Sequence, residues 1–246
     1  MNRIFTVDIG NTAAKGSVFD DFRPVATRIV DNAADPDSLL ELARLYNVDG
    51  VAFCSVGSTV SDFGSRLRSM LSLPVVELTS DTPLPFEIVY GSPRTLGVDR
   101  IAAAAGAIHK YGGDVLVVDA GTAVTIDLIN PRGFMGGNIS PGLRLRVRSL
   151  NAFTAKLPLV RPDGDMPRRG SDTETAIRCG VVGGLVSEIA GEYFETQNDF
   201  PGIRLVMTGG DADFLRPLLE KKGVKVEIDH DLVGLGLVSI YNYNRK

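Results

Sequence analysis

Apolar residues along the chain form two similar series of predicted elements. In the first half, short apolar runs predict strands, while leucines at helical spacing and a second amphipathic stretch predict two helices. The expected strands are residues 3–8, 16–19, 24–30, 50–55 and 75–78, and the expected helices are 37–46, capped by Asp37, and 59–71. The order is three strands, a helix, a strand, a second helix and a strand.

The second half repeats this order after a glycine pair at 112–113. A helix is expected at 99–110, before this boundary. After it, strands are expected at 115–119, 123–129, 132–138, 203–208 and 224–228, and helices at 141–150, 172–197, 211–222 and 232–244. Residues 79–98 and 154–170 are expected to be irregular, and the first of these segments is either a linker or a substrate loop. The repeated order is typical of ribonuclease-H-like α/β lobes with mixed sheets flanked by helices. We therefore predict two lobes, residues 1–112 and 113–246.

Composition excludes several classes of function. A formal net charge of −4 over 246 residues argues against a nucleic-acid-binding surface. The two cysteines, Cys54 and Cys179, are expected to be buried free thiols, and with two scattered histidines they cannot form a usual zinc site. No apolar run reaches the ~18 residues that a membrane-spanning helix needs. The first residues enter a strand rather than a signal peptide, so a cytoplasmic protein is expected.

Two glycine turns carry the first candidate chemistry. The stretch 5–15 and its repeat at 117–127 are apolar strands that end in Asp8 or Asp119, followed by a glycine and small polar residues. A glycine lets backbone N–H groups approach an anion, Lys15 supplies a positive charge suited to phosphate, and Asp8 is placed to orient a hydrated Mg²⁺. When Asp8 is aligned with Asp119, Lys15 falls opposite Ile126, so the second turn lacks a lysine that could bind phosphate.

The alternative for each turn is an ordinary hairpin, where Gly-Asn is common. The Walker phosphate loop is not matched. The repetition of the turn in both halves favours nucleotide binding over two unrelated hairpins. A third glycine turn, Gly209-Gly210 with Asp211 as a helix cap, suits an adenosine contact or a plain strand-to-helix loop equally well.

The stretch Leu96-Gly-Val-Asp-Arg100 places an acid and a base side by side at the start of a helix. The helix dipole keeps Asp99 ionised, which suits a residue that orients or deprotonates a hydroxyl. Arg100 is suited to a carboxylate. The alternative is that Asp99 only caps the helix and Arg100 is solvated. Arg144, Arg146, Arg148 and Lys156 are either an anion patch or solvated surface.

These stretches together resemble the type III pantothenate kinases, of the superfamily that includes acetate and sugar kinases, Hsp70 and actin. The resemblance covers essentially the whole chain and implies a duplicated actin-like ATPase fold. Ser92 and Val98 depart from it, since Asn and Ala are more usual there. The matching stretches are residues 8–15, 90–100, 118–127, 136–142, 170–177, 208–211 and 231–244.

The resemblance also implies roles for single residues. Asp99 is expected to be the general base for the pantothenate hydroxyl, and Asp119 to serve a monovalent cation site for K⁺ or NH₄⁺. Thr173 is expected to contact pantothenate, across a homodimer interface. The remaining substrate-binding residues are Tyr90, Gly97, Val98, Asp99 and Arg100, and the ATP-binding residues are Asp8, Ile9, Gly10, Asn11, Thr12, Ala13, Ala14, Lys15 and Thr122.

The implied reaction is transfer of phosphate from ATP, with Mg²⁺, to pantothenate, which gives 4′-phosphopantothenate in coenzyme A biosynthesis. Such a transfer asks a protein mainly for positioning and charge neutralisation. Two alternatives stay open: a kinase of the same superfamily with another hydroxyl substrate, and a non-enzymatic accessory transcription regulator. An intact Asp8, Lys15 and Asp99 argue against the regulator, because a pure binder needs no base.

Overall fold

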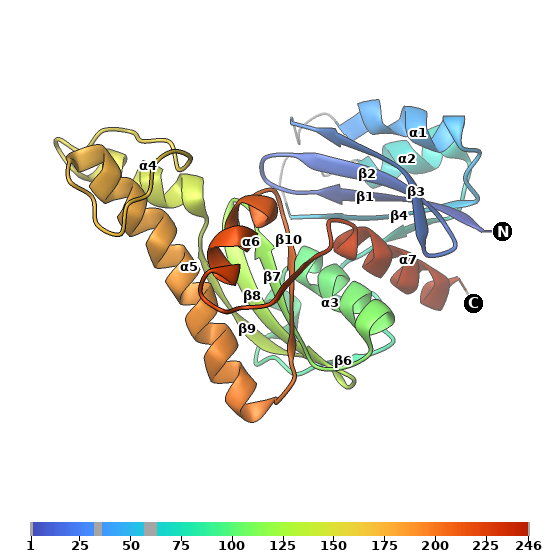
Figure 1. Ribbon diagram of the computed structural model, residues 1–246. Helices are drawn as coiled ribbons and strands as arrows, with labels where there is room; N and C mark the ends of the chain where they lie inside the picture. Colours follow the sequence, from blue (N-terminus) through green and yellow to red (C-terminus); the bar gives the residue numbers. More distant parts are fainter. Residues whose placement is uncertain (1, 32–35, 57–62, 246) are drawn as a thin grey trace. The chain divides into compact units, whose positions relative to one another are not determined.

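A computed structural model describes residues 2–31, 36–56 and 63–245 (Figure 1). Two sheets, each flanked by helices, form its framework. The predicted helix at 37–46 is a 3₁₀ turn, η1 (Pro36–Leu39), followed by a short helix, α1 (Leu40–Leu45). The predicted helix at 59–71 is described from Phe63 onward, as α2 (Phe63–Leu71), and its expected start lies outside the described residues.

The first sheet has the strand order β3-β2-β1-β4-β5. Apolar side chains on one face, including Phe5 and Val7, pack with Leu40 of α1 and Leu67 of α2. Both faces of the central strand are covered, because five of the seven β1 residues are buried and only Arg3 and Asp8 are partly exposed. The strands are β1 (Arg3–Ile9), β2 (Ala14–Asp20), β3 (Arg23–Val30), β4 (Gly50–Ser55) and β5 (Val75–Glu77).

The second sheet repeats this order and adds one strand, giving β11-β10-β7-β8-β9-β6. The repeat of β3-β2-β1-β4-β5 as β9-β8-β7-β10-β11 confirms the predicted duplicated fold. The sequence analysis did not predict β6 (Glu87–Ile88), a two-residue strand inside the irregular segment 79–98. The other strands are β7 (Val115–Ala120), β8 (Ala123–Asn130), β9 (Gly133–Pro141), β10 (Arg204–Thr208) and β11 (Val226–Ile228).

The chain forms two compact units. Unit 1 comprises residues 1–113, 129–136 and 231–246, and unit 2 comprises residues 114–128 and 137–230. The last helix, α7 (Leu232–Asn244), thus belongs to the same unit as the first sheet. Its residue Gly234 lies against Phe19 and Thr6 of that sheet.

Helices α3 (Val98–Tyr111) and α7 of unit 1 pack closely because glycines meet backbone at their crossing. A methyl group on Gly106 of α3 would overlap the carbonyl of Leu232, and one on Gly236 of α7 would overlap the carbonyl of Ala102. Backbone atoms cannot rotate out of the way, so both positions require glycine. This crossing fixes the start of α3, where Asp99 lies.

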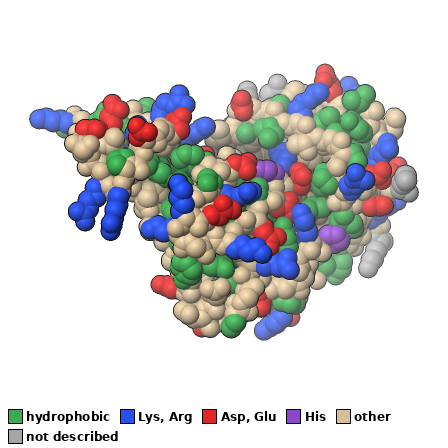
Figure 2. Space-filling view, viewed as in Figure 1, with side chains coloured by type: hydrophobic (Ala, Val, Ile, Leu, Met, Phe, Trp, Pro, Cys, Tyr) green, Lys and Arg blue, Asp and Glu red, His purple; other side chains and the backbone are tan. Residues whose placement is uncertain are grey.

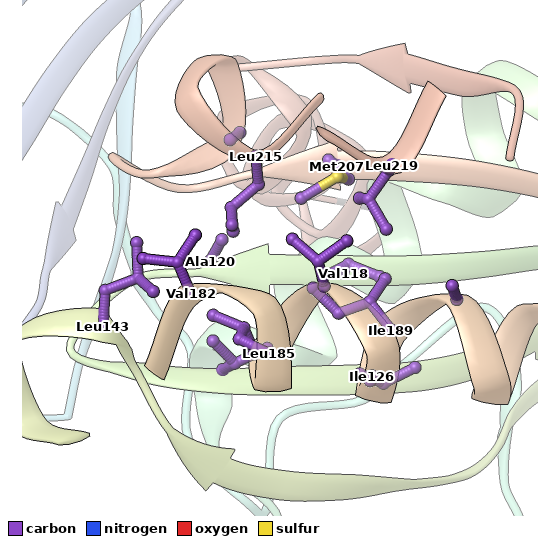
Figure 3. Packing of buried hydrophobic residues seen from close by; sticks show 14 of the residues in the cluster. Val118, Ala120, Ile126, Leu143, Val182, Leu185, Ile189, Met207, Leu215 and Leu219 are labelled. Carbon is purple, nitrogen blue, oxygen red and sulfur yellow. The ribbon is translucent and has the colours of Figure 1, made fainter. Parts of the chain in front are cut away.

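The core of unit 2 lies between its sheet and two helices, α5 (Thr173–Asp199) and α6 (Ala212–Glu220). Figure 3 shows Val118 and Ile126 of the sheet meeting Leu185 and Ile189 of α5. A further helix, α4 (Leu143–Phe153), precedes the loop at 154–170, which is irregular as predicted. Within the described residues, no helix has the length and apolar character needed to cross a membrane.

Candidate active site

Three strands of the first sheet bring Asp8 together with two other functional side chains. Asp8 of β1 pairs in register with Lys15 of β2 and with Cys54 of β4. Residues in register on adjacent strands share a face of the sheet. The Cys54 thiol donates a hydrogen bond to Asp8 Oδ1 at 3.5 Å. Cys54 is the buried free thiol that was predicted, but its contact with Asp8 was not foreseen.

The electrostatic setting of Asp8 is unusual for a carboxyl group. Its pKa is raised from 3.8 to about 6, mainly by burial and then by the negative charge of Asp99, while the Cys54 hydrogen bond and Lys15 oppose the rise. The pKa of Cys54 is also raised, by burial and by Asp8, so the thiol stays protonated and acts as a donor. Two carboxyl groups near one another with a single lysine leave negative charge to be neutralised.

Lys15 has a partner that the sequence did not reveal. Its Nζ lies 3.0 Å from Oδ1 of Asp231, the residue that precedes α7, and both side chains are partly buried. The lysine is thereby held beside the first glycine turn by the start of the last helix. Because 216 positions separate the two residues, only the packing of α7 on the first sheet brings them together.

The two glycine turns differ by one residue. The Gly10 N–H donates to the carbonyl of Ala13, whereas the Gly121 N–H donates to the carbonyl of Ala123, each at 3.0 Å. The exposed Asn11 and Thr12 form the tip of the first turn.

The shorter second turn changes the correspondence between the two repeats. Lys15 comes two residues after Ala13, whose carbonyl closes the first turn. Two residues after Ala123, whose carbonyl closes the second turn, is Thr125 and not Ile126, so Thr125 is the counterpart of Lys15. Burial agrees, because Lys15 and Thr125 are partly exposed and Ile126 is buried. The predicted alignment was one residue out of register, but the second turn still lacks a lysine.

Asp119 of unit 2 lies at the carboxyl end of β7, in register with Thr208 of β10. Two glycines border its carboxylate. A Cβ on Gly209 would lie 2.5 Å from Asp119 Oδ1, and one on Gly121 would lie 3.7 Å away. Gly209 also has a φ of +90°, which favours glycine. Missing side chains thus leave room around a carboxylate at this end of the sheet.

Asp99 lies in the first turn of α3, one position after Val98, and Gly97 is the N-cap. Its Oδ1 accepts a hydrogen bond from the backbone N–H of Arg100 at 2.8 Å. A Cβ on Gly97 would come within 2.5 Å of that oxygen, so the glycine allows this orientation. Asp99 is partly exposed, and its charge acts on Asp8. Asp99 and the first turn therefore lie within electrostatic reach of each other in unit 1.

Arg100 is not the solvated residue of the alternative hypothesis, since it is only 5% exposed. Its guanidinium carbon lies 5.3 Å from the centre of the Phe134 ring, a cation–π arrangement. The same ring makes an edge contact with Tyr90, with ring centres 5.8 Å apart. Phe134, which the sequence analysis did not single out, therefore joins two predicted substrate residues.

Thr122 and Thr173 both belong to unit 2 and are exposed. Thr173 is the first residue of α5. Asp172 caps that helix by accepting from the Thr175 N–H, in a capping box. Thr173 thus lies in the first turn of a 27-residue helix, where the helix dipole favours negative charge.

The remaining predicted groups are less suited to a site. In Figure 2, basic side chains project from the region of α4 and the following loop. Arg146 there fits neither alternative, because it is paired with Glu188 at 2.5 Å and donates to the carbonyl of Pro141. Cys179 is only partly buried, contrary to prediction. Among residues 2–31, 36–56 and 63–245, no group of three or more His, Cys, Asp or Glu side chains is arranged to hold a metal.

Comparison with known proteins confirms the resemblance found in the sequence. The type III pantothenate kinase family profile matches residues 4–194. Type III pantothenate kinases from Bacteroides fragilis and Phocaeicola vulgatus are each 40% identical, over 97% and 98% of both chains respectively.

Solved structures agree on the fold. One described as a conserved Baf family transcriptional activator from Campylobacter jejuni has a TM-score of 0.64 at 23% identity, over 98% of each chain. A ROK family glucokinase from Streptomyces griseus has a TM-score of 0.55 at 14% identity, over 99% of each chain. The fold is thus that of sugar kinases, and the chain belongs to the type III pantothenate kinase family.

Proposed function

We propose that this protein transfers the γ-phosphoryl group of ATP to the primary hydroxyl of pantothenate, the first step of coenzyme A biosynthesis, with Asp99 as the base. Family membership supports the substrate. The observation that carries the chemistry is that the Asp99 carboxylate lies close enough to Asp8 of the first turn to raise its pKa, within one compact unit. A phosphate site beside an acid that accepts a hydroxyl proton is what phosphoryl transfer requires.

In this proposal the first turn holds the ATP phosphates. The backbone around Gly10 and the tip residues Asn11 and Thr12 supply donors, and Lys15 supplies a positive charge. Lys15 starts from its pair with Asp231, so its ammonium is already placed at the turn. Thr122 is proposed as a further phosphate contact. The full ATP set is Asp8, Ile9, Gly10, Asn11, Thr12, Ala13, Ala14, Lys15 and Thr122.

Asp8 fits a role in holding Mg²⁺, because its carboxyl is partly buried near a second acid and has too little positive charge around it. When bound, the metal neutralises charge on the transferring phosphate. With only one carboxylate from this turn, a metal would keep water and phosphate ligands, as Mg²⁺ usually does. Lys15 and the turn amides then neutralise the rest of the developing charge.

Asp99 is proposed to take the proton of the pantothenate hydroxyl as the oxygen attacks phosphorus. The Arg100 N–H holds one oxygen of its carboxylate, which leaves the other oxygen for the substrate. Tyr90, Gly97, Val98 and Arg100 are proposed to hold pantothenate. Thr173 is proposed as a further contact, supplied across a homodimer interface.

A monovalent cation, K⁺ or NH₄⁺, is proposed to bind at Asp119. The support is the uncrowded carboxylate between Gly121 and Gly209. We also propose that the lobes 1–112 and 113–246 are the duplicated halves of the fold, and that the protein acts in the cytoplasm.

The proposal is tested by pantothenate-dependent ADP release, measured for the wild type with and without K⁺. Asp99→Asn should lower kcat by about 10²–10⁴-fold, the usual contribution of a general base, while ATP still raises the melting temperature. No ADP release by the wild type with pantothenate would refute the function. ADP release with another alcohol instead would favour the alternative of a different hydroxyl substrate.

A further inference from the structure

We propose that Phe134 is a positioning residue for the acceptor half of the site, because it holds Arg100 and Tyr90 in place together. This inference rests on the proposed function, since both residues are proposed to hold pantothenate. Phe134 need not touch the substrate itself, as its side chain is fully buried. All three residues lie in unit 1.

The first contact is with Arg100. Arg100 is only 5% exposed and has lost most of its water, and the face of the Phe134 ring, whose centre lies 5.3 Å from the guanidinium carbon, offers partial negative charge to it. An aliphatic side chain of similar size fills space but has no such face. The ring therefore influences the direction of the guanidinium group. Because Arg100 follows Asp99 in the first turn of α3, the same contact also helps to hold the backbone beside Asp99.

The second contact fixes Tyr90. The two rings meet edge to face, with an interplanar angle of 82° and centres 5.8 Å apart. The backbone adds to this, because the Val89 N–H donates to the Phe134 carbonyl at 2.8 Å and Ile88 pairs with Phe134 between β6 and β9. Phe134 thus anchors, by side chain and backbone, the otherwise irregular segment that carries Tyr90.

The attachment is reinforced one residue away on each strand. Glu87 pairs with Gly133, and Gly133 has a φ of +148° in direct contact with the backbone of Glu87. Arg132 forms an ion pair with Glu87 at 3.0 Å. Strand β9 therefore holds the segment that carries Tyr90, and the Phe134 ring on this strand contacts both Tyr90 and Arg100.

The test compares Phe134→Leu with the wild type in the ADP-release assay, with pantothenate and ATP varied separately. We expect the KM for pantothenate to rise about tenfold, which corresponds to ~1.4 kcal/mol, the order of a desolvated cation–π contact. The KM for ATP should change less than twofold, because the residues that the ring contacts, Arg100 and Tyr90, are proposed to hold pantothenate and not ATP.

Phe63→Leu is the matched control. Phe63 is also a fully buried phenylalanine of unit 1, with an edge contact to Phe53, but it packs in the core under the first sheet. We expect it to lower the melting temperature while leaving both KM values unchanged. If Phe134→Leu does not fold, Phe134→Met replaces it, since methionine adapts to irregular cavities.

A double-mutant cycle separates positioning from a general structural role. In an Arg100→Met background, Phe134→Leu should raise the pantothenate KM by less than in the wild type, because one of the two contacts that it removes, the one with Arg100, is already gone. Equal effects in both backgrounds, or equal rises in the KM for ATP and pantothenate, would overturn the inference and leave the proposed function standing. A wild type without pantothenate-dependent activity would overturn both.

Discussion

Asp8 is under opposing demands at the scale of a single residue. To hold a metal its carboxyl must be ionised, yet burial and Asp99 raise its pKa to about 6. The thiol of Cys54 and the ammonium of Lys15 favour the ionised form, so the strands on both sides of β1 offset part of the cost. This is the pattern of a site residue, in which local stability is reduced for function.

The same residue gives a pH-dependent prediction for stability without ligands. Between pH 3.8 and about 6 the folded protein keeps a proton on Asp8 that the unfolded chain has released, so folded wild type loses stability as the pH rises. Asp8→Asn has no such loss. We expect its melting temperature to exceed that of the wild type by a margin that grows from pH 4.5 to about 6.5 and is constant above it.

A control for this measurement is Asp163→Asn. Asp163 is an exposed residue whose pKa is lowered by Arg161, the opposite direction. Because surface ion pairs contribute little, its melting curve should follow that of the wild type or fall slightly below it at neutral pH. A margin for Asp8→Asn that does not change with pH would contradict the assigned pKa.

At the scale of elements, the crossing of α3 and α7 determines where the base lies. Gly236→Ala places a methyl group on the Ala102 carbonyl, so the helices must separate. We expect a loss of about 1–3 kcal/mol, although alanine alone favours a helix. The melting temperature should fall, and kcat should fall with it, because α3 carries Asp99.

The matched control for this crossing is Gly184→Ala on α5, where a methyl group would meet nothing within 4 Å. Here only helix propensity changes, so stability should rise by up to ~1 kcal/mol. Melting temperatures and kcat of both variants, measured side by side, test whether the crossing requires glycine. A Gly236→Ala protein as stable and active as Gly184→Ala would show that the crossing is not tight.

The elements also show what a sequence pattern can and cannot reveal. The limits of β4 and α7 were predicted to the residue because apolar runs there end at clear breaks. Strand β6 was missed, since two residues carry no period. The partners of Lys15 and Arg100 were missed for another reason. Asp231 and Phe134 are far away in sequence, and only the sheet order and helix packing bring them close.

At the scale of the whole molecule, duplication of one fold provides two aspartates at equivalent strand ends with different surroundings. Asp8 has Lys15 in register beside it, whereas Asp119 has Thr208 and two glycines. The corrected alignment puts Thr125 where a lysine would stand. An aspartate whose neighbouring strand carries threonine at the lysine position suits a bound cation, while one beside a lysine suits a phosphate.

This difference predicts separate effects of the two aspartates on ion dependence. Asp119→Asn should raise the K⁺ concentration for half-maximal activity about tenfold, the loss expected from one charged ligand worth ~1.4 kcal/mol, and saturating K⁺ should restore much of the rate. Asp8→Asn should instead lower kcat at every K⁺ concentration.

The control is Asp114→Asn, just before the opposite end of β7, which should leave the K⁺ response unchanged. A shift in that variant, or no shift in Asp119→Asn, would place the cation elsewhere. Titration with KCl at constant ionic strength, balanced with choline chloride, measures all three, because it keeps general screening the same while only the specific ion varies.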